Sequence, residues 1–484
     1  MINWKMITRI MGALLFIEAG FLLLCSLFPV FYKEDDLLPF LLSAGITAIC
    51  GLAAFYFGKD AGTKFGRRDG YLIVTLAWIG FSLFGMLPYR LSGYIPNLTD
   101  AFFETMSGFT TTGASTLDNI AALPHGLLFW RSMTQWIGGM GIVFFTIAVL
   151  PIFGIGSVQL FAAEATGPTH DKVHPRIGVT AKWIWGIYFG LTAAEMGLLV
   201  LGGMSPFDSL CHSLTTTATG GFSTRQSSIA TYGSAYIEYV ITVFMFLSGI
   251  SFTLLYLLLV KGNFRKLFHD TEFRYYIGIV AGFTLFTTMM LLLTGSTGLE
   301  ESFRKAIFQV VAIQTTTGFC SQDYMMWGSV LWTLMCILML FGACAGSTTG
   351  GMKCIRIAIM ARVAKNEFKH ILHPNAVLPV RINRQVVPSS TLSIVLAFIF
   401  IYVVIILVGW IVLMLCGIPF MEAYSLAVSS LNNIGIALGD YGPIYSWNAL
   451  PDFAKWFCTL LMLAGRLELF TVLLLFSPAF WKEH

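Results

Sequence analysis

Length, composition and charge place this chain in a membrane and exclude an ordinary soluble domain. It has 484 residues, of which 56% are hydrophobic and only 11% are charged, whereas a typical soluble domain carries about 25% charged residues. Apolar runs recur from residue 10 to residue 478 without a polar segment long enough to fold alone, so we expect one membrane domain. The nine cysteines are scattered without paired or metal-ligand spacing, which predicts no disulfide framework.

Ten stretches of the sequence are long and apolar enough to cross a bilayer. In chain order they are approximately 10–31, 37–57, 70–91, 127–151, 179–202, 236–260, 275–295, 328–371 with an interruption, 390–416 and 453–478. The first run is longer than the core of a signal peptide and lacks a small-residue cleavage site, so we expect it to remain as a spanning helix. An even number of spans puts both termini on the same side of the membrane.

The basic residues set the orientation, because cytoplasmic loops are enriched in lysine and arginine. The linkers after alternate spans carry Lys59, Lys64, Arg67, Arg68, Lys172, Arg176, Lys182, Lys261, Arg265, Lys266 and Arg274, and the stretch from Lys353 to Arg384 adds more. We therefore expect these linkers and both termini to face the cytoplasm. The opposite side is rich in acidic residues, which either concentrate cations at an entrance or are the ordinary polar residues of short loops.

An internal repeat is the most informative feature of the sequence. The segments DAFFETMSGFTTTGAS (100–115), DSLCHSLTTTATGGFS (208–223), KAIFQVVAIQTTTGFC (305–320) and EAYSLAVSSLNNIGIA (422–437) align without a gap, and their shared glycines are Gly113, Gly221, Gly318 and Gly435. Each segment lies between two spans on the acidic side. A helix of about ten residues is only about 15 Å long, so each segment must enter the membrane, turn at its polar cluster and return to the same side.

Backbone at membrane depth requires hydrogen-bonding partners, because lipid offers none. Four such segments around one axis would direct carbonyl groups and threonine hydroxyls at a narrow polar hole, and the C-terminal ends of four short helices would favour a cation there. Asp100, Asp208 and Glu422 fall in the first turn of their helices, where we favour a capping role over direct ion contact, while Lys305 stands there in the third segment. One TTTG string alone would indicate a polar turn, but four in register indicate an ion filter.

At these residues the sequence resembles the Trk/Ktr/HKT superfamily of potassium transporters, and within it the bacterial TrkH-type subunits. The resemblance covers nearly the whole chain. It implies an all-α membrane protein with ten transmembrane helices, four re-entrant pore helices and four pseudo-symmetric helix-pore-helix repeats. The implied divisions are an extra N-terminal helix pair (1–58), repeat 1 (59–152), repeat 2 (153–261), repeat 3 with an interrupted inner helix (262–384) and repeat 4 (385–484).

The resemblance also implies which residues bind the transported potassium, mainly through backbone carbonyls. These are Thr111, Thr112, Thr219, Gly220, Thr316, Thr317, Asn433 and Ile434, a pair before each aligned glycine. With a single glycine at the filter position of each quarter, the filter should be short and should discriminate loosely among potassium, rubidium and sodium. The NNIGI sequence of the fourth quarter departs most from TTTG and could weaken selectivity further.

A candidate gate interrupts the eighth span at FGACAGSTTGGMK (341–353). Glycine costs a helix about 1 kcal/mol relative to alanine, so this run predicts a loop inside the membrane, whereas small-residue packing between helices is the alternative. We expect its backbone to line the pore below the filter, and the expected gate residues are Gly346, Ser347, Thr348, Thr349, Gly350 and Gly351. Arg466, within an apolar run, must face inward because a buried guanidinium costs a few kcal/mol. The resemblance places Arg466 beside the loop, and a structural pair with Glu468, Glu195 or Glu18 is the alternative.

The sequence therefore predicts a gated, channel-like potassium uptake subunit in a bacterial inner membrane, permeable also to rubidium and weakly to sodium. The rival is a secondary transporter that couples potassium to protons or sodium, and Glu18, Glu195 or Glu468 would be the candidates for proton coupling. We find no catalytic motif, no cofactor site and no reason to expect a nucleic-acid partner, and the pairs His170/His174 and His370/His373 lack a third metal ligand. The resemblance implies a homodimer docked on a cytosolic ring of nucleotide-binding subunits of the TrkA type, while the basic 353–384 stretch would suit an acidic partner or lipid headgroups.

Overall fold

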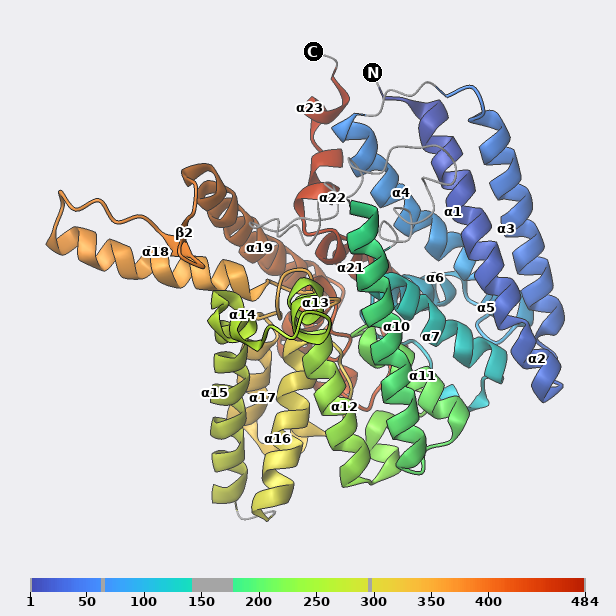
Figure 1. Ribbon diagram of the computed structural model, residues 1–484. Coiled ribbons are helices and arrows are strands. Elements are labelled where there is room, and N and C mark those ends of the chain that lie inside the picture. The colour runs from blue at the N-terminus through green and yellow to red at the C-terminus, as the bar shows by residue number, and fades with distance from the viewer. Residues whose placement is uncertain (1, 62–65, 142–176, 295–297, 483–484) are drawn as a thin grey trace.

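The computed structural model describes residues 2–61, 66–141, 177–294 and 298–482 of the chain (Figure 1). Helices dominate these residues, and one small antiparallel sheet, β1 (Arg381–Ile382) with β2 (Gln385–Val386), is the only sheet among them. The expectation of a helical membrane protein is thus confirmed. The end of the predicted 127–151 span, the basic residues Lys64, Lys172 and Arg176, and the pair His170/His174 lie outside the described residues.

Six of the described helices are long and apolar enough to cross a membrane, and one bent pair makes a possible seventh. The longer elements are α1 (Trp4–Cys25), α3 (Leu37–Phe57), α4 (Arg67–Gly85), α7 (His125–Gly139), α10 (Ile177–Leu201), α12 (Ala235–Ser248), α15 (Thr271–Leu293), α17 (Ser329–Leu338), α18 (Cys354–Leu372), α19 (Ser389–Leu415) and α21 (Asp452–Arg466). The shorter elements are α2 (Leu27–Tyr32), α5 (Leu87–Ser92), α13 (Phe252–Leu259), α14 (Phe264–His269), α22 (Phe470–Leu475), α23 (Pro478–Trp481), η1 (Ile120–Ala122), η3 (Ser228–Tyr232), η4 (Tyr324–Trp327) and η5 (Gly439–Tyr441).

The N-terminal helices α1 and α3 pack along each other at one edge of the molecule (Figure 1). Gly12 and Gly51 bring their backbones together, since a Cβ atom added at Gly12 would meet the Gly51 carbonyl oxygen at 2.6 Å. Close backbone contact at small residues is the usual way in which apolar helices associate in lipid, where burial alone gives little driving force.

Four short helices carry the repeated segments: α6 (Leu98–Phe109), α11 (Pro206–Thr217), α16 (Leu299–Gln314) and α20 (Phe420–Asn432). The half of each helix that leads into its polar cluster is buried. Helix α21 contacts both α20 and α6, so it connects the last short helix to the first. The predicted re-entrant segments therefore fold as short helices, each too short to span a bilayer.

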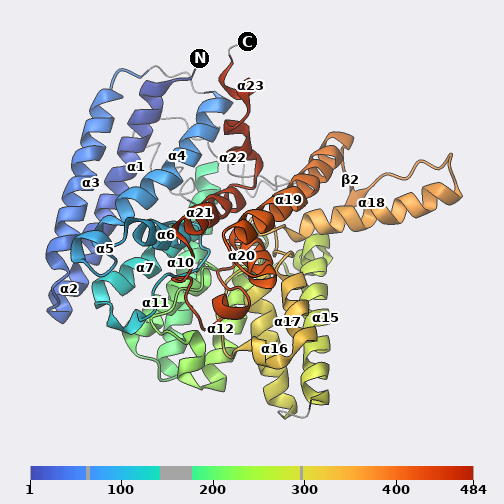
Figure 2. The ribbon, with the colours of Figure 1, turned by 180° about the vertical axis from the view of Figure 1, so that it is seen from behind.

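The helices that follow three of the short ones, α11, α16 and α20, are interrupted. Helices α12 and α13 bend by 108° at their junction, α17 ends at Leu338 long before α18 begins at Cys354, and α21 gives way to α22 through Glu468 and Leu469, both of which have positive φ. The sequence predicted only the α17–α18 interruption. Helix α18 then extends away from the helical body in both views (Figures 1 and 2).

Candidate functional site

Each short helix ends in the same backbone turn, which we call a ring segment (110–114, 218–222, 315–319 and 432–436). The second residue of each ring segment has a left-handed φ, which is 54° at Thr111, Thr219 and Thr316 and 56° at Asn433. The aligned glycine two residues later also has a positive φ, with values of 81° at Gly113, 76° at Gly221, 76° at Gly318 and 85° at Gly435. Threonine rarely adopts this conformation, so its recurrence points to a functional constraint on the backbone.

Hydrogen bonds explain how the turns present their carbonyl groups. The amide of the third residue of each ring segment donates to a carbonyl oxygen of its own helix: Thr112 to Ser107 at 2.9 Å, Gly220 to Thr215 at 2.9 Å, Thr317 to Ala312 at 2.9 Å and Ile434 to Ser429 at 3.0 Å. This pattern is a Schellman-type helix end. Because N–H and C=O point in opposite directions across a trans peptide, the carbonyl of the preceding residue points away from the helix.

The four ring segments close into a ring. A Cβ atom added at Gly113 would collide with the carbonyl oxygen of Gly220. The same relation joins Gly221 to Thr317, Gly318 to Ile434, and Gly435 back to Thr112. Since the series returns to its starting quarter, the segments surround one axis. All four glycines also line one small cavity of about 60 Å³.

The structure adds buried polar residues around this ring that sequence reasoning missed. The Arg131 guanidinium lines the cavity, forms a fully buried ion pair with Glu104 at 2.8 Å and donates to the carbonyl oxygen of Ser223 at 3.0 Å. The sequence did carry a signal for this ion pair, because Glu104 and Arg131 are opposite charges on two consecutive apolar helices. The carboxylate of Asp208 raises the pKa of Arg225, so a second guanidinium on the cavity wall stays charged.

Gln135 on α7 braces the second ring segment. Its Nε2 donates to the carbonyl oxygen of Gly220 at 2.7 Å and its Oε1 accepts the amide of Phe222 at 3.0 Å. A Cβ atom at Gly220 would collide with the Gln135 side chain. This contact explains why the second quarter has glycine where the first and third have threonine.

The acids at the starts of the short helices occupy the predicted first turn but mostly serve ion pairs. Asp100 pairs with Lys455 at 2.6 Å, and Asp208 pairs with Arg225 at 2.9 Å. Side-chain caps come instead from Asn97 on α6 and Ser205 on α11. The capping role that the sequence favoured for these carboxylates is therefore taken by their neighbours, and their charge is partly neutralised within the protein.

The loop 341–353 lies directly against the ring. The hydroxyl of Thr219 donates to that of Thr348 at 3.3 Å, and the amide of Gly350 donates to the hydroxyl of Thr316 at 2.8 Å. A Cβ atom at Gly350 would also collide with the Asn432 carbonyl oxygen. The loop thus touches the second, third and fourth quarters of the ring.

Arg466 connects this loop to the remaining quarter. Its Nη1 donates to the hydroxyl of Thr111 at 3.0 Å and to the carbonyl oxygen of Thr348 at 2.9 Å. Its Nη2 donates to the carbonyl oxygens of Gly138 at 2.5 Å and Gly139 at 3.1 Å. Glu468, one of the alternative partners of Arg466, forms an ion pair with Arg356.

A ring of backbone turns at the ends of four short helices, among several long apolar helices, defines a helical multi-pass membrane protein. A sequence profile of the TrkH family, described as cation transport protein, matches residues 39–483. The chain belongs to the TrkH family.

Full-length relatives agree with this assignment. The Trk system potassium uptake protein TrkH of Halomonas elongata is 38% identical over 481 residues, which covers 99% of each chain. The Trk system potassium uptake protein TrkH of Escherichia coli K12 is 37% identical over 486 residues, with 99% of this chain and 100% of the relative covered. The crystal structure of the potassium transporter TrkH from Vibrio parahaemolyticus matches with a TM-score of 0.90 and 34% identity, over 99% of this chain and 100% of that chain. These relatives are transporters, not enzymes.

Proposed function

We propose that this chain is the translocating subunit of a Trk-type system and takes up potassium through a gated, channel-like pore in a bacterial inner membrane. The observation that carries the proposal is the closed ring of four ring segments, in which each glycine packs against the carbonyl of the next quarter. The proposed architecture has ten spanning helices, four helix-pore-helix repeats and both termini in the cytoplasm.

The ring is suited to replacing the water around an alkali cation. In this proposal, potassium is the transported substrate and contacts carbonyl oxygens of Thr111, Thr112, Thr219, Gly220, Thr316, Thr317, Asn433 and Ile434. The C-terminal ends of the four short helices each place about half a negative charge near the ring, which favours a cation over an anion. The short filter should also pass rubidium and, weakly, sodium.

The loop and Arg466 form the proposed gate. Residues Gly346 to Gly351 occupy the space next to the ring, and Thr348 receives a hydrogen bond from Arg466. A fixed positive charge beside the ion path raises the energy of a passing cation. Opening then requires that the tip of the loop leave the ring and that its bond to Arg466 break.

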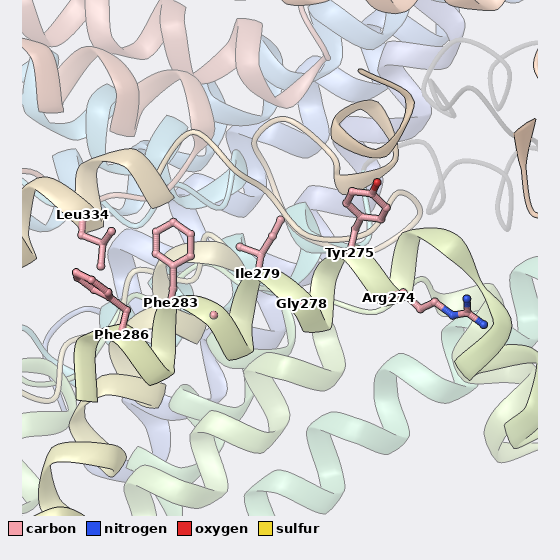
Figure 3. Close-up of a pocket in the computed structure, with 8 residues that line it drawn as sticks. Arg274, Tyr275, Gly278, Ile279, Phe283, Phe286 and Leu334 are labelled. Carbon is pink, nitrogen blue, oxygen red and sulfur yellow. The ribbon is translucent and has the colours of Figure 1, made fainter. Parts of the chain in front are cut away.

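Homodimerisation is part of the proposal and is supported by an apolar groove of about 610 Å³ along α15 (Figure 3). Gly278 and Gly282 lie four residues apart in this groove, and neither has a described neighbour close enough to touch an added Cβ atom. Paired glycines with this spacing allow a second helix to pack closely in a membrane. Docking of a cytosolic nucleotide-binding ring of the TrkA type would use the basic cytoplasmic surface.

The proposal is tested by conductance measurements on reconstituted protein, comparing wild type with Gly113→Ser. A serine at this position faces both the positive φ and the Gly220 carbonyl oxygen, so we expect the potassium-to-sodium permeability ratio to fall. A variant with normal yield and unaltered selectivity would show that Gly113 does not line the ion path. Wild-type protein that carries no alkali cation would contradict the proposed function itself.

A second candidate is potassium transport coupled to protons. It is favoured by Glu18 on α1, which is fully buried and whose carboxylate makes no hydrogen bond within the part of the chain that the structure describes. Ionisable residues inside membranes often mark proton pathways. A reversal potential that shifts with the pH gradient would favour coupling, whereas one that follows the potassium gradient alone would favour the channel.

A further inference from the structure

The loop 341–353 has a neck whose two ends run side by side. The amide of Gly342 donates to the carbonyl oxygen of Met352 at 2.9 Å, and the amide of Cys354 donates to the carbonyl oxygen of Ala343 at 2.9 Å. The tip, from Gly346 to Gly351, projects beyond this neck to the ring. A neck that is held fixed would confine movement to the tip.

One buried carboxylate joins both sides of the neck. Glu272, in the first turn of α15, is only 7% exposed. Its Oε1 accepts the amide of Ala345 at 2.7 Å and the amide of Ile355 at 2.9 Å, one on each side of the tip. A buried backbone amide without a hydrogen-bond partner is costly, so Glu272 satisfies a donor on each side of the neck.

The residues just before Glu272 are bound to the hairpin of β1 and β2. Asn383, in the turn of this hairpin, accepts the amide of Thr271 at 2.7 Å through Oδ1. Its Nδ2 donates to the Asp270 carboxylate at 2.7 Å. The amide of Asn383 in turn donates to the Thr271 hydroxyl at 3.3 Å. A displacement of the hairpin therefore acts on the N-terminus of α15.

We propose that Glu272 is a positioning residue for the gate: it holds the neck of the loop and connects it, through the N-terminus of α15, to the β1–β2 hairpin. The contacts form one continuous series from hairpin to neck to tip. We call the two hydrogen bonds of Glu272 to the amides of Ala345 and Ile355 the clasp. The expected effect on ion flux rests on the proposed function, whereas the clasp depends only on these hydrogen bonds. Weakening either end of the series should loosen the loop.

The test combines amide hydrogen exchange of the full-length protein with rubidium flux into liposomes. Glu272→Ala should speed exchange in peptides that contain Ala345 and Ile355 on the order of tenfold, because two buried amides lose their acceptor, and should raise flux. Glu272→Gln keeps an oxygen that can accept both amides, so it should stay close to wild type. Asp69→Ala is the matched control, because Asp69 is a buried carboxylate that accepts the amides of Asn3 and Gly66 away from the loop.

Asn383→Ala examines the connection from the other end and disturbs only a surface turn. We expect faster exchange of the neck peptides, by at least roughly twofold, together with higher flux. Wild-type exchange in Glu272→Ala would overturn the clasp, and wild-type exchange in Asn383→Ala would overturn the connection to the hairpin. If Glu272→Ala does not fold, Asn383→Ala decides the proposal. Absence of flux in wild type would contradict the proposed function, while exchange would still report on the clasp.

Discussion

Replacing Arg466 with alanine removes the contact that joins the loop to the first quarter of the ring. Of the four hydrogen bonds that its guanidinium makes within the described part of the chain, one goes to the loop, at the Thr348 carbonyl oxygen, and one to the ring, at the Thr111 hydroxyl. The other two go to Gly138 and Gly139 at the end of α7. Only the bond to Thr348 must break when the loop moves away, so this bond determines how Arg466 affects the closed state.

The size of the effect follows from this single bond. A hydrogen bond from a charged donor contributes about 1.5–3 kcal/mol. Its loss should shift the equilibrium between closed and open loops on the order of 10- to 100-fold toward the open state. Removing a positive charge beside the proposed ion path should lower the barrier to a cation further. We therefore expect Arg466→Ala to raise rubidium flux when no regulatory subunit is present.

The assay is uptake of labelled rubidium into liposomes containing purified protein at equal density. Arg304→Ala is the matched control, since Arg304 is a partly buried arginine that pairs with Glu238 and Glu300 and does not touch the loop. Arg466→Lys should give an intermediate flux, because lysine keeps the charge but cannot reach four acceptors in a planar arrangement. Flux at or below the wild-type level, in a variant that elutes as folded protein, would refute the assignment of Arg466 to the gate.

Two further predictions concern the ring and the loop between α2 and α3. Gln135→Leu removes two hydrogen bonds, to Gly220 and Phe222, each contributing about 1 kcal/mol, so the potassium-to-sodium permeability ratio should fall by up to roughly 30-fold. Gln309 is a buried glutamine of α16 without a described side-chain hydrogen bond, so Gln309→Leu should leave the ratio unchanged. Equal ratios in the two variants would contradict the bracing role of Gln135. Burial raises the pKa of Asp36 from 3.8 to about 6, so the wild type should lose stability as pH rises through that interval. Asp36→Asn should therefore melt at a higher temperature than wild type at pH well above 6, but not below pH 4. A melting-temperature difference that is the same at both pH extremes would contradict this reasoning.

The repeat was predictable because it depends on local patterns. Helix starts, polar clusters and glycines at fixed offsets are visible in one sequence, and the need to satisfy backbone groups in lipid leaves few ways to arrange four copies. The interruption after α17 was predictable for a similar reason, since its glycines and hydroxyl residues disfavour a helix. Both predictions depend on residues that act on the backbone conformation at their own positions.

The unpredicted features depend on contacts between distant segments. The bend between α12 and α13 falls at the short sequence Ser248–Gly249–Ile250–Ser251. A single glycine between serines does not by itself distinguish a bend from the ordinary end of a helix. The brace from Gln135 and the clasp from Glu272 each join residues that are far apart in the chain. Nothing in the sequence indicates which buried polar side chain meets which backbone group, because those pairings are decided by packing.

The fourth quarter shows why the ring does not depend on the TTTG sequence itself. Its Asn433 has nearly the same φ as the threonines at the matching positions, and asparagine tolerates this conformation better than threonine does. Its amide group also makes contacts that a threonine hydroxyl could not make together, donating to the Thr112 hydroxyl at 3.0 Å and to the Met462 carbonyl oxygen at 2.9 Å. The backbone of the ring is therefore set by how each helix ends, so any difference in ion preference among the quarters should come from the side chains that support them.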